Sequence, residues 1–354
     1  MKKFVLIVMS LFFSTFLYAG QITQIVILGD SLSDNGNLYR VLKVVPKSPP
    51  YYQGRFTNGL TWADHVGNFY YNKSYIDTAN YAVGGATSIL HSPIHDTFVA
   101  PVTLTGELYD YLIRSLFTDK SNVLYVVWIG ANDYLYEMDP DMQTITTNVV
   151  NNISWAVNTL IDQGAKNFVV MDLPDLSRIP YARDSNLIPR LHEITMMHNQ
   201  KLANAVKEIK SNHAGTKITF IRISDIFNDV LDHTEKYNQL YHKNLHNITT
   251  ACWTGDITLK SAAHTDMLAK ELKTALAHDK VSASKNFDTH AMATSILNSP
   301  SLSEAYTVGK LYEQGITPCS DADERVFWDH VHPTASMHEI LASIFESDMT
   351  EFDL

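Results

Sequence analysis

The first residue that could do chemistry is Ser31, in the stretch QIVILGDSLSDNGN (24–37), where it follows an apolar run that ends at Gly29. A serine hydroxyl at the end of a buried strand is a candidate nucleophile if a base lies close to it. The same residues also fit S-x-x-D, an approximate capping box in which the Ser31 hydroxyl would satisfy backbone donors at a helix start. The stretch by itself leaves both roles open.

A candidate base for this serine lies near the other end of the chain, in WDHVHP (328–333). Asp329 and His332 are three residues apart and share a face of a turn, so the carboxylate can orient the imidazole towards a nucleophile. The alternative is an ordinary surface turn capped by Asp329. His330 and His332 also form an H-x-H pair, but no other acidic and histidine cluster has the spacing to complete a metal site. We therefore expect no metal ion.

Two short segments supply candidate donors for a negatively charged intermediate. TANYAVGGAT (78–87) ends in Gly84 and Gly85, and GAND (130–133) contains Asn132. A glycine offers its backbone N–H with no side chain in the way, and the asparagine offers a side-chain amide, so both suit an oxyanion hole. In isolation, each is also an ordinary turn residue.

These residues must be positioned by the elements around them, and the pattern of those elements indicates an α/β fold. Short continuous apolar runs are typical of parallel strands covered on both faces, and helical periodicity lies between them. We expect a three-layer α/β/α domain, doubly wound, with a mostly parallel central sheet and its functional groups past the carboxyl ends of the strands. The predicted strands are 24–30, a short strand within 78–87, 123–130, 167–174 and 217–224, and the clearest predicted helices are 142–163 and 187–210.

Taken in order, four blocks of this chain resemble the GDSL esterase/lipase family, also called SGNH hydrolases, over residues 24–345. The resemblance implies that Ser31 is the nucleophile, His332 the general base and Asp329 its orienting carboxylate, with no cofactor. It also implies an oxyanion hole made by the Ser31 backbone N–H, Gly85 and Asn132. Gly85 is preferred to Gly84 because it follows Asn80 by five residues. The blocks are Gly29-Asp30-Ser31-Leu32, Asn80-Tyr81-Ala82-Val83-Gly84-Gly85, Gly130-Ala131-Asn132-Asp133 and Asp329-His330-Val331-His332.

Two further stretches, SDNGNLY (33–39) and GRFTNGLTWADHV (54–66), resemble the secreted bacterial branch of the family. That branch includes glycerophospholipid:cholesterol acyltransferases and the type II-secreted lysophospholipase A of Legionella. The resemblance implies a lysophospholipase A or phospholipase A, with lysophospholipid or phospholipid as substrate and cholesterol as an acyl acceptor. A carbohydrate O-deacetylase or short-chain esterase shares the same four blocks, and a non-catalytic module on a retained hydrolase fold is the third alternative. Tyr51, Tyr52 and Phe56 are candidates for acyl contact or for the core.

The N-terminal segment predicts export. Residues 1–19 have a basic start, an apolar stretch and a small-residue end, which is the pattern of a signal peptide, so we expect one hydrolase domain over 20–354 and a secreted protein, extracellular or periplasmic. The chain has a net charge of −11 and no basic run, which argues against nucleic acid as a partner. The same charge argues against electrostatic capture by anionic membranes, so we expect only peripheral membrane contact.

Cys252 and Cys319 are the two cysteines of the chain, and in an exported protein they fit one disulfide. The α/β rhythm weakens between them, so we interpret 252–319 as a disulfide-tethered insertion with one helix at 265–278 and a polar connector at 279–290. In the resembled branch, cleavage within such a loop raises activity, which implies an activating protease as a partner. The alternative is a plain stabilising crosslink.

Overall fold

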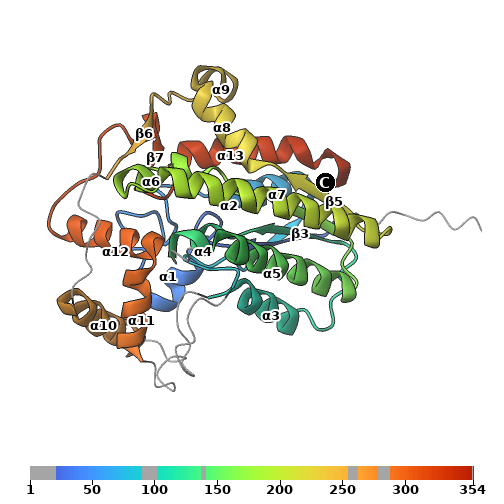
Figure 1. The fold of residues 1–354 in the computed structure, drawn as a ribbon, viewed down its shortest axis with the longest axis horizontal. Coiled ribbons are helices and arrows are strands. Elements are labelled where there is room, and N and C mark those ends of the chain that lie inside the picture. The colour runs from blue at the N-terminus through green and yellow to red at the C-terminus, as the bar shows by residue number, and fades with distance from the viewer. Residues whose placement is uncertain (1–20, 90–101, 137–140, 254–261, 278–287, 353) are drawn as a thin grey trace, which may run out of the picture.

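The apolar runs of the sequence form one five-stranded parallel sheet at the centre of the molecule, in the order β2-β1-β3-β4-β5 (Figure 1). The strands β1, β3 and β4 are almost wholly buried, because both faces of the sheet are covered by helices. A second, two-stranded parallel sheet pairs β6 with β7. The strands are β1 (Gln24–Gly29), β2 (Asp77–Asn80), β3 (Val123–Trp128), β4 (Asn167–Met171), β5 (Lys217–Ile221), β6 (Asn247–Ala251) and β7 (Arg325–Phe327).

The computed structural model describes residues 21–89, 102–136, 141–253, 262–277, 288–352 and 354. The predicted signal peptide and most of the predicted connector at 279–290 therefore lie outside the described residues.

Two helical layers enclose the sheet and complete the predicted three-layer α/β/α architecture. The helices α2 and α13 pack together as one layer, and α5 packs against both α3 and α7 in the other. The α-helices are α1 (Asn37–Leu42), α2 (Trp62–Ser74), α3 (Leu104–Arg114), α4 (Ala131–Tyr136), α5 (Met142–Asp162), α6 (Pro180–Asp184), α7 (Ile188–Asn212), α8 (Ile223–Asp232), α9 (Thr234–Tyr241), α10 (Ala262–Ala277), α11 (Thr289–Asn298), α12 (Pro300–Glu313) and α13 (Ala335–Asp348).

The region between the two cysteines contains more helix than the sequence predicts. Cys252 and Cys319 form the expected disulfide, and α10, α11 and α12 lie within the insertion that it closes. Only α10 corresponds to the predicted helix. The residues Pro300–Gly309 of α12 are all buried, so this helix has no solvent-exposed face along most of its length and shows little amphipathic pattern in the sequence.

The helices of the insertion lie beside the main domain, at the lower left of Figure 1. They share a second hydrophobic cluster with residues of that domain. Helix α10 contacts α1, and α12 contacts α4. The cluster also takes in Tyr51, Phe56 and Trp328, which come from segments that flank the predicted catalytic residues. The insertion therefore packs against segments close to the predicted site residues. Among the described residues, no helix is both long enough and apolar enough to span a bilayer.

Candidate active site

Ser31 lies in a turn between β1 and α1, and it does not cap a helix. The backbone N–H groups of Ser33 and Asp34 both donate to the Asp30 carbonyl oxygen, which closes the turn directly after the strand. Helix α1 begins only at Asn37, with Gly36 at the N-cap position. The capping-box interpretation is therefore wrong.

The carboxylate of Asp34, rather than the hydroxyl of Ser31, accepts hydrogen bonds from the backbone at the start of α1. It accepts hydrogen bonds from the backbone N–H groups of Gly36, Asn37 and Leu38, at 2.5 to 3.2 Å. An acidic side chain just ahead of a helix suits these otherwise unpaired donors. The hydroxyl of Ser31 is thereby left for another partner.

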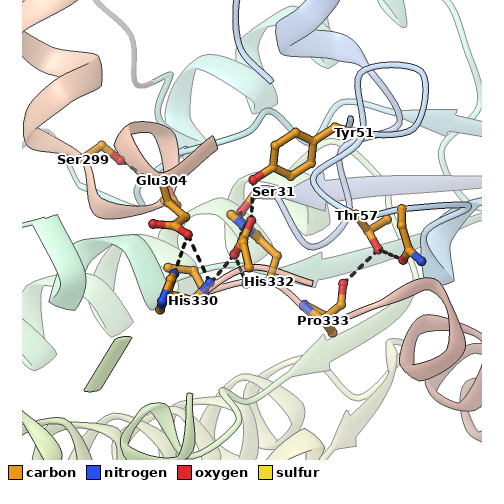
Figure 2. Close-up of polar contacts among 12 residues, drawn as sticks. Ser31, Tyr51, Thr57, Ser299, Glu304, His330, His332 and Pro333 are labelled. Carbon is orange, nitrogen blue, oxygen red and sulfur yellow. Dashed lines mark hydrogen bonds and ion pairs between the residues drawn. The ribbon is translucent and has the colours of Figure 1, made fainter. Parts of the chain in front are cut away.

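That partner is His332, which lies 301 positions from Ser31 in the sequence. The Nε2 atom of His332 lies 2.9 Å from the Ser31 Oγ, and its Nδ1 lies 2.8 Å from Oδ2 of Asp329. All three side chains are buried, and Ser31 and His332 are labelled in Figure 2. This is the arrangement in which an imidazole accepts a proton from a hydroxyl while a carboxylate fixes its tautomer.

Asp329 is held in place by several donors besides the imidazole. Its Oδ1 accepts the backbone N–H groups of Val331 and His332, at 2.8 and 2.7 Å, so the turn itself fixes the carboxylate. Its Oδ2 accepts the hydroxyl of Tyr51 at 2.6 Å. Burial alone would raise the pKa of Asp329, but attraction to His332 and the hydrogen bonds from His332 and Tyr51 hold this pKa below its ordinary value.

The two glycines that follow β2 have different roles. The N–H of Gly84 donates to Oδ2 of Asp34 at 2.7 Å, so it is already engaged. Gly85 has a φ of +74°, and no acceptor among the described residues receives its N–H. A Cβ at Gly85 would lie 2.6 Å from side-chain carbons of Leu302, so close packing as well as backbone conformation requires glycine here.

Asn132 lies at the start of α4, where β3 ends. Its Nδ2 donates to the carbonyl oxygen of Ala86 at 3.0 Å, which connects it directly to the residue after Gly85. Its Oδ1 accepts the hydroxyl of Ser301 at 2.8 Å. An amide nitrogen carries two hydrogens, so one N–H of Asn132 remains for another acceptor.

Buried carboxylates shape the backbone around Ser31. Glu107 accepts the N–H groups of Gly29 and Val83, at 2.9 and 3.2 Å, and thereby joins the loops after β1 and β2. Asp30, directly before Ser31, accepts the N–H of Leu32. Burial raises the pKa of Asp30 to about 7 and raises the pKa of Glu107 well above its ordinary value. Within the described residues, neither Asp30 nor Glu107 forms an ion pair with a lysine or arginine, so backbone N–H groups are the donors that hold these carboxylates.

A cavity opens beside Ser31 at the carboxyl ends of the strands. Its volume is about 40 Å³. Its polar lining is limited to Asp30, Ser31, Asn132 and His332. Gly85 is not among its lining residues. The rest of the lining is apolar: Leu32, Trp128, Ala131, Leu135, Pro174, Leu176, Ile179, Phe227, Phe327, Val331, Pro333 and Leu341.

The second histidine of the H-x-H pair belongs to a different network. The Nδ1 atom of His330 lies 2.6 Å from Oε1 of Glu304 on α12 (Figure 2), while both nitrogens of His332 face Ser31 and Asp329. The two histidines therefore do not converge on one point. Within the described part of the chain, no group of three or more candidate ligands is arranged to hold a metal ion.

Sequence reasoning missed three residues around the site. Tyr51 is buried, as expected for one of the two alternatives, but its hydroxyl bonds Asp329, which neither alternative included. Ser301 and Glu304 come from α12, a helix that the sequence did not predict. A lone tyrosine or serine gives no local pattern, so no sequence signal distinguishes these residues from their neighbours.

Comparison with known proteins finds several that are similar to this chain. A protein similar to this chain is the phosphatidylcholine-sterol acyltransferase of Aeromonas hydrophila, 28% identical over 337 residues that cover 93% of this chain and 92% of that protein. The secreted effector protein SseJ of Salmonella typhimurium is 28% identical over 217 residues, which cover 60% of this chain and 50% of that protein.

Among solved structures, an acetylxylan esterase from Geobacillus stearothermophilus is 14% identical, with a TM-score of 0.38, and the match covers 60% of this chain and 81% of that one. The family described as GDSL-like Lipase/Acylhydrolase matches residues 25–345, which include every predicted site residue. The chain belongs to the GDSL-like lipase/acylhydrolase family.

Proposed function

We propose that this protein is a secreted serine ester hydrolase that releases fatty acids from lysophospholipids and phospholipids. The single observation that carries the proposal is that His332 joins Ser31 to Asp329 beside a cavity with a mostly apolar lining. The lining supports an aliphatic acyl group, because each buried methylene contributes about 0.8 kcal/mol and needs no hydrogen-bond partner. A sugar in the same cavity would leave many of its hydroxyls unpaired.

In the proposed reaction, the Nε2 of His332 takes the proton of Ser31 as Oγ attacks the ester carbonyl carbon. The carbonyl oxygen becomes an oxyanion, which accepts hydrogen bonds from the Ser31 N–H, the Gly85 N–H and the free N–H of Asn132. His332 then returns the proton to the leaving alcohol, and water releases the acyl group from Ser31 by the reverse steps. Asp329 stays ionised and stabilises the imidazolium.

A second acceptor is part of the proposal. The Aeromonas relative, which this chain matches over nearly the full length of both proteins, is a phosphatidylcholine-sterol acyltransferase. We therefore propose that a sterol such as cholesterol can replace water as the acceptor of the acyl group. Neither reaction needs a metal ion or a cofactor, because the proton moves between Ser31 and His332.

Export and processing are further parts of the proposal. The disulfide between Cys252 and Cys319 is consistent with an oxidising compartment, which supports secretion to the periplasm or the exterior with peripheral contact to lipid surfaces. We propose that a protease cleaves the polar connector at 279–290 and raises activity. Higher turnover of a nicked, still disulfide-linked protein supports this step, and unchanged turnover contradicts it.

The test is a substrate panel run with the wild type and Ser31→Ala. Lysophosphatidylcholine, a diacyl phospholipid, a monoacylglycerol and an acetylated xylo-oligosaccharide are incubated with and without cholesterol, and fatty acid, acetate and cholesteryl ester are measured. We expect long-chain fatty acid from the lipids and a loss of at least about 10³-fold in Ser31→Ala. The control is Ser343→Ala, which removes a hydroxyl that donates to the Glu339 carbonyl oxygen of its own helix.

Each result decides between the candidates. Release of acetate from the sugar, with no fatty acid from any lipid, favours a carbohydrate O-deacetylase over the proposal. Full lipid hydrolysis by Ser31→Ala contradicts the mechanism itself.

A further inference from the structure

The first turn of α12 lies against the candidate oxyanion donors, although it belongs to the disulfide-closed insertion. The hydroxyl of Ser301 is 2.8 Å from Oδ1 of Asn132, and both side chains are buried. The next residue, Leu302, fills the space in which a Cβ at Gly85 would lie. One turn of one helix therefore contacts both residues that are proposed to act together with the Ser31 N–H.

The hydrogen bonds of Asn132 define which way its amide points. The Ala86 carbonyl oxygen can only accept, so the group 3.0 Å from it must be the amide nitrogen. Oδ1 then faces Ser301, whose hydroxyl must donate to it. A flipped amide would place two oxygens against each other at Ala86. The two contacts together hold the amide plane and leave one N–H of Asn132 for the cavity that it lines with Ser31.

The hydroxyl of Ser301 is itself supported. The Ser299 Oγ lies 3.3 Å from the Ser301 Oγ, and both residues are buried. Since the Ser301 hydrogen goes to Asn132, which offers only an acceptor there, Ser299 is the donor in this pair. A short chain of hydroxyls thus runs from the start of α12 to the Asn132 carbonyl oxygen.

We propose that Ser301 is a positioning residue for ester hydrolysis, which fixes the side-chain amide of Asn132 so that its free N–H meets the oxyanion. This inference rests on the proposed function, and specifically on Asn132 as a donor. Oxyanion donors accelerate a reaction because they are already oriented when charge develops. Without the hydroxyl, Oδ1 of Asn132 is buried with no donor, and the amide rotates away from its productive orientation.

The test compares Ser301→Ala with Ser303→Ala. Ser303 lies on the same helix and is equally buried, but its Oγ has no hydrogen-bond partner among the described residues, so it controls for the loss of a buried hydroxyl. We expect Ser301→Ala to lower kcat about tenfold, which is part of the 10²- to 10³-fold attributed to a whole oxyanion donor. KM should match that of Ser303→Ala, whereas the thermal midpoint of Ser301→Ala should be the lower of the two, because Oδ1 of Asn132 loses its buried donor.

Two further measurements separate positioning from a structural role. Affinity for an alkylboronic acid, whose serine adduct is tetrahedral, should fall in Ser301→Ala but not in Ser303→Ala. Ser301→Thr keeps the hydroxyl on the same carbon, and we expect it to recover most of the lost kcat.

A double-mutant cycle with Asn132→Ala distinguishes this inference from the proposed function. If Ser301 acts through Asn132, then Ser301→Ala has no further effect on kcat once Asn132 is alanine. If the losses of kcat are additive in the double variant, the inference is overturned. It is also overturned if Asn132→Ala has a lowered kcat but Ser301→Ala has the same kcat as Ser303→Ala. If Asn132→Ala leaves kcat unchanged, the oxyanion assignment fails and the inference fails with it.

Discussion

At the scale of single residues, the site depends on which side chains accept hydrogen bonds from the backbone N–H groups around Ser31. Asp34 binds the N–H groups at the start of α1 and also that of Gly84, so one buried carboxylate organises two loops. This leaves the Ser31 hydroxyl to His332. It also leaves the N–H of Gly85, rather than that of Gly84, as the candidate oxyanion donor.

A first prediction concerns Tyr51. Tyr51→Phe removes the hydroxyl that donates to Oδ2 of Asp329 at 2.6 Å and keeps the buried ring. Hydrogen bonds to charged groups contribute about 1.5 to 3 kcal/mol, so the free energy of unfolding should fall by about that amount. We expect kcat to fall about tenfold, because Asp329 then holds His332 less firmly.

Urea unfolding and steady-state kinetics on one lipid ester check both numbers. The control is Tyr52→Phe, which removes the hydroxyl of a neighbouring tyrosine that is 38% exposed. Equal kcat values for Tyr51→Phe and Tyr52→Phe would show that the Tyr51 hydroxyl is not needed to hold Asp329.

At the scale of elements, α12 is the part of the insertion that reaches the site. Ser301 in its first turn bonds Asn132, and Glu304 one turn later bonds His330 (Figure 2). His330 lies next to Asp329 in the chain, so α12 contacts both Asn132 and the segment that carries Asp329 and His332. An insertion that only lengthened the chain would make no such contacts.

A second prediction follows from the pair formed by Glu304 and His330. Burial disfavours the charge on His330, but its hydrogen bond and attraction to Glu304 outweigh burial and raise the pKa of His330, with Asp329 and Asp184 of α6 adding to the attraction. Burial also raises the pKa of Glu304. The folded pair therefore keeps a proton that the unfolded chain releases. Its stabilisation is fully present below the unfolded histidine pKa of about 6.5 and is lost as the pH rises through the folded pKa.

Glu304→Gln should accordingly lower the free energy of unfolding by about 1.5 to 3 kcal/mol at pH 6 and by less at pH 8.5. Denaturant unfolding at both values measures this. Glu271→Gln is the matched control, because it breaks the partly exposed pair with Lys310 on the same helix and involves no histidine. A loss for Glu304→Gln that is the same at pH 6 and pH 8.5 would contradict the pairing.

At the scale of the whole molecule, the site lies where two hydrophobic clusters meet. The buried residues of β1, the strand before Ser31, belong to the main cluster. Tyr51, Phe56 and Trp328 belong to the second cluster, which includes the helices of the insertion. The ring of Phe56 packs against His332, with ring centroids 5.1 Å apart. The arrangement of the candidate site residues therefore depends on the folding of both clusters.

A third prediction concerns the disulfide that closes the insertion. Cys252 and Cys319 are 67 positions apart, so replacing both by alanine should cost about 4 kcal/mol of unfolding free energy, through the greater entropy of the unfolded chain. We expect activity to be lost at a lower urea concentration in the variant, together with its structure. Reductant should produce the same shift in the wild type and none in the double variant, and equal midpoints for the two proteins would contradict the prediction.

Much of the fold could be predicted because parallel strands and amphipathic helices leave local patterns. The predicted helix at 142–163 corresponds to α5 and that at 187–210 to α7. The predicted strands were too long at their carboxyl ends, where buried residues such as Ile129 and Leu173 continue the apolar run beyond β3 and β4. Those residues are buried because the loops after the strands are covered too, so apolar character alone does not mark where a strand ends.

The sequence by itself determined the four motif blocks and the family, and it selected Ser31, Asp329 and His332 as the candidate catalytic residues, because the types and order of these residues suffice for the resemblance. Only the tertiary structure decided that Asp34 rather than Ser31 serves the helix start, and that Tyr51, Ser301 and Glu304 hold the site. The partners of Tyr51 and Ser301 lie 278 and 169 positions away in the chain. A hydrogen bond of that kind depends on how distant elements pack, and neither residue carries a local pattern that records it.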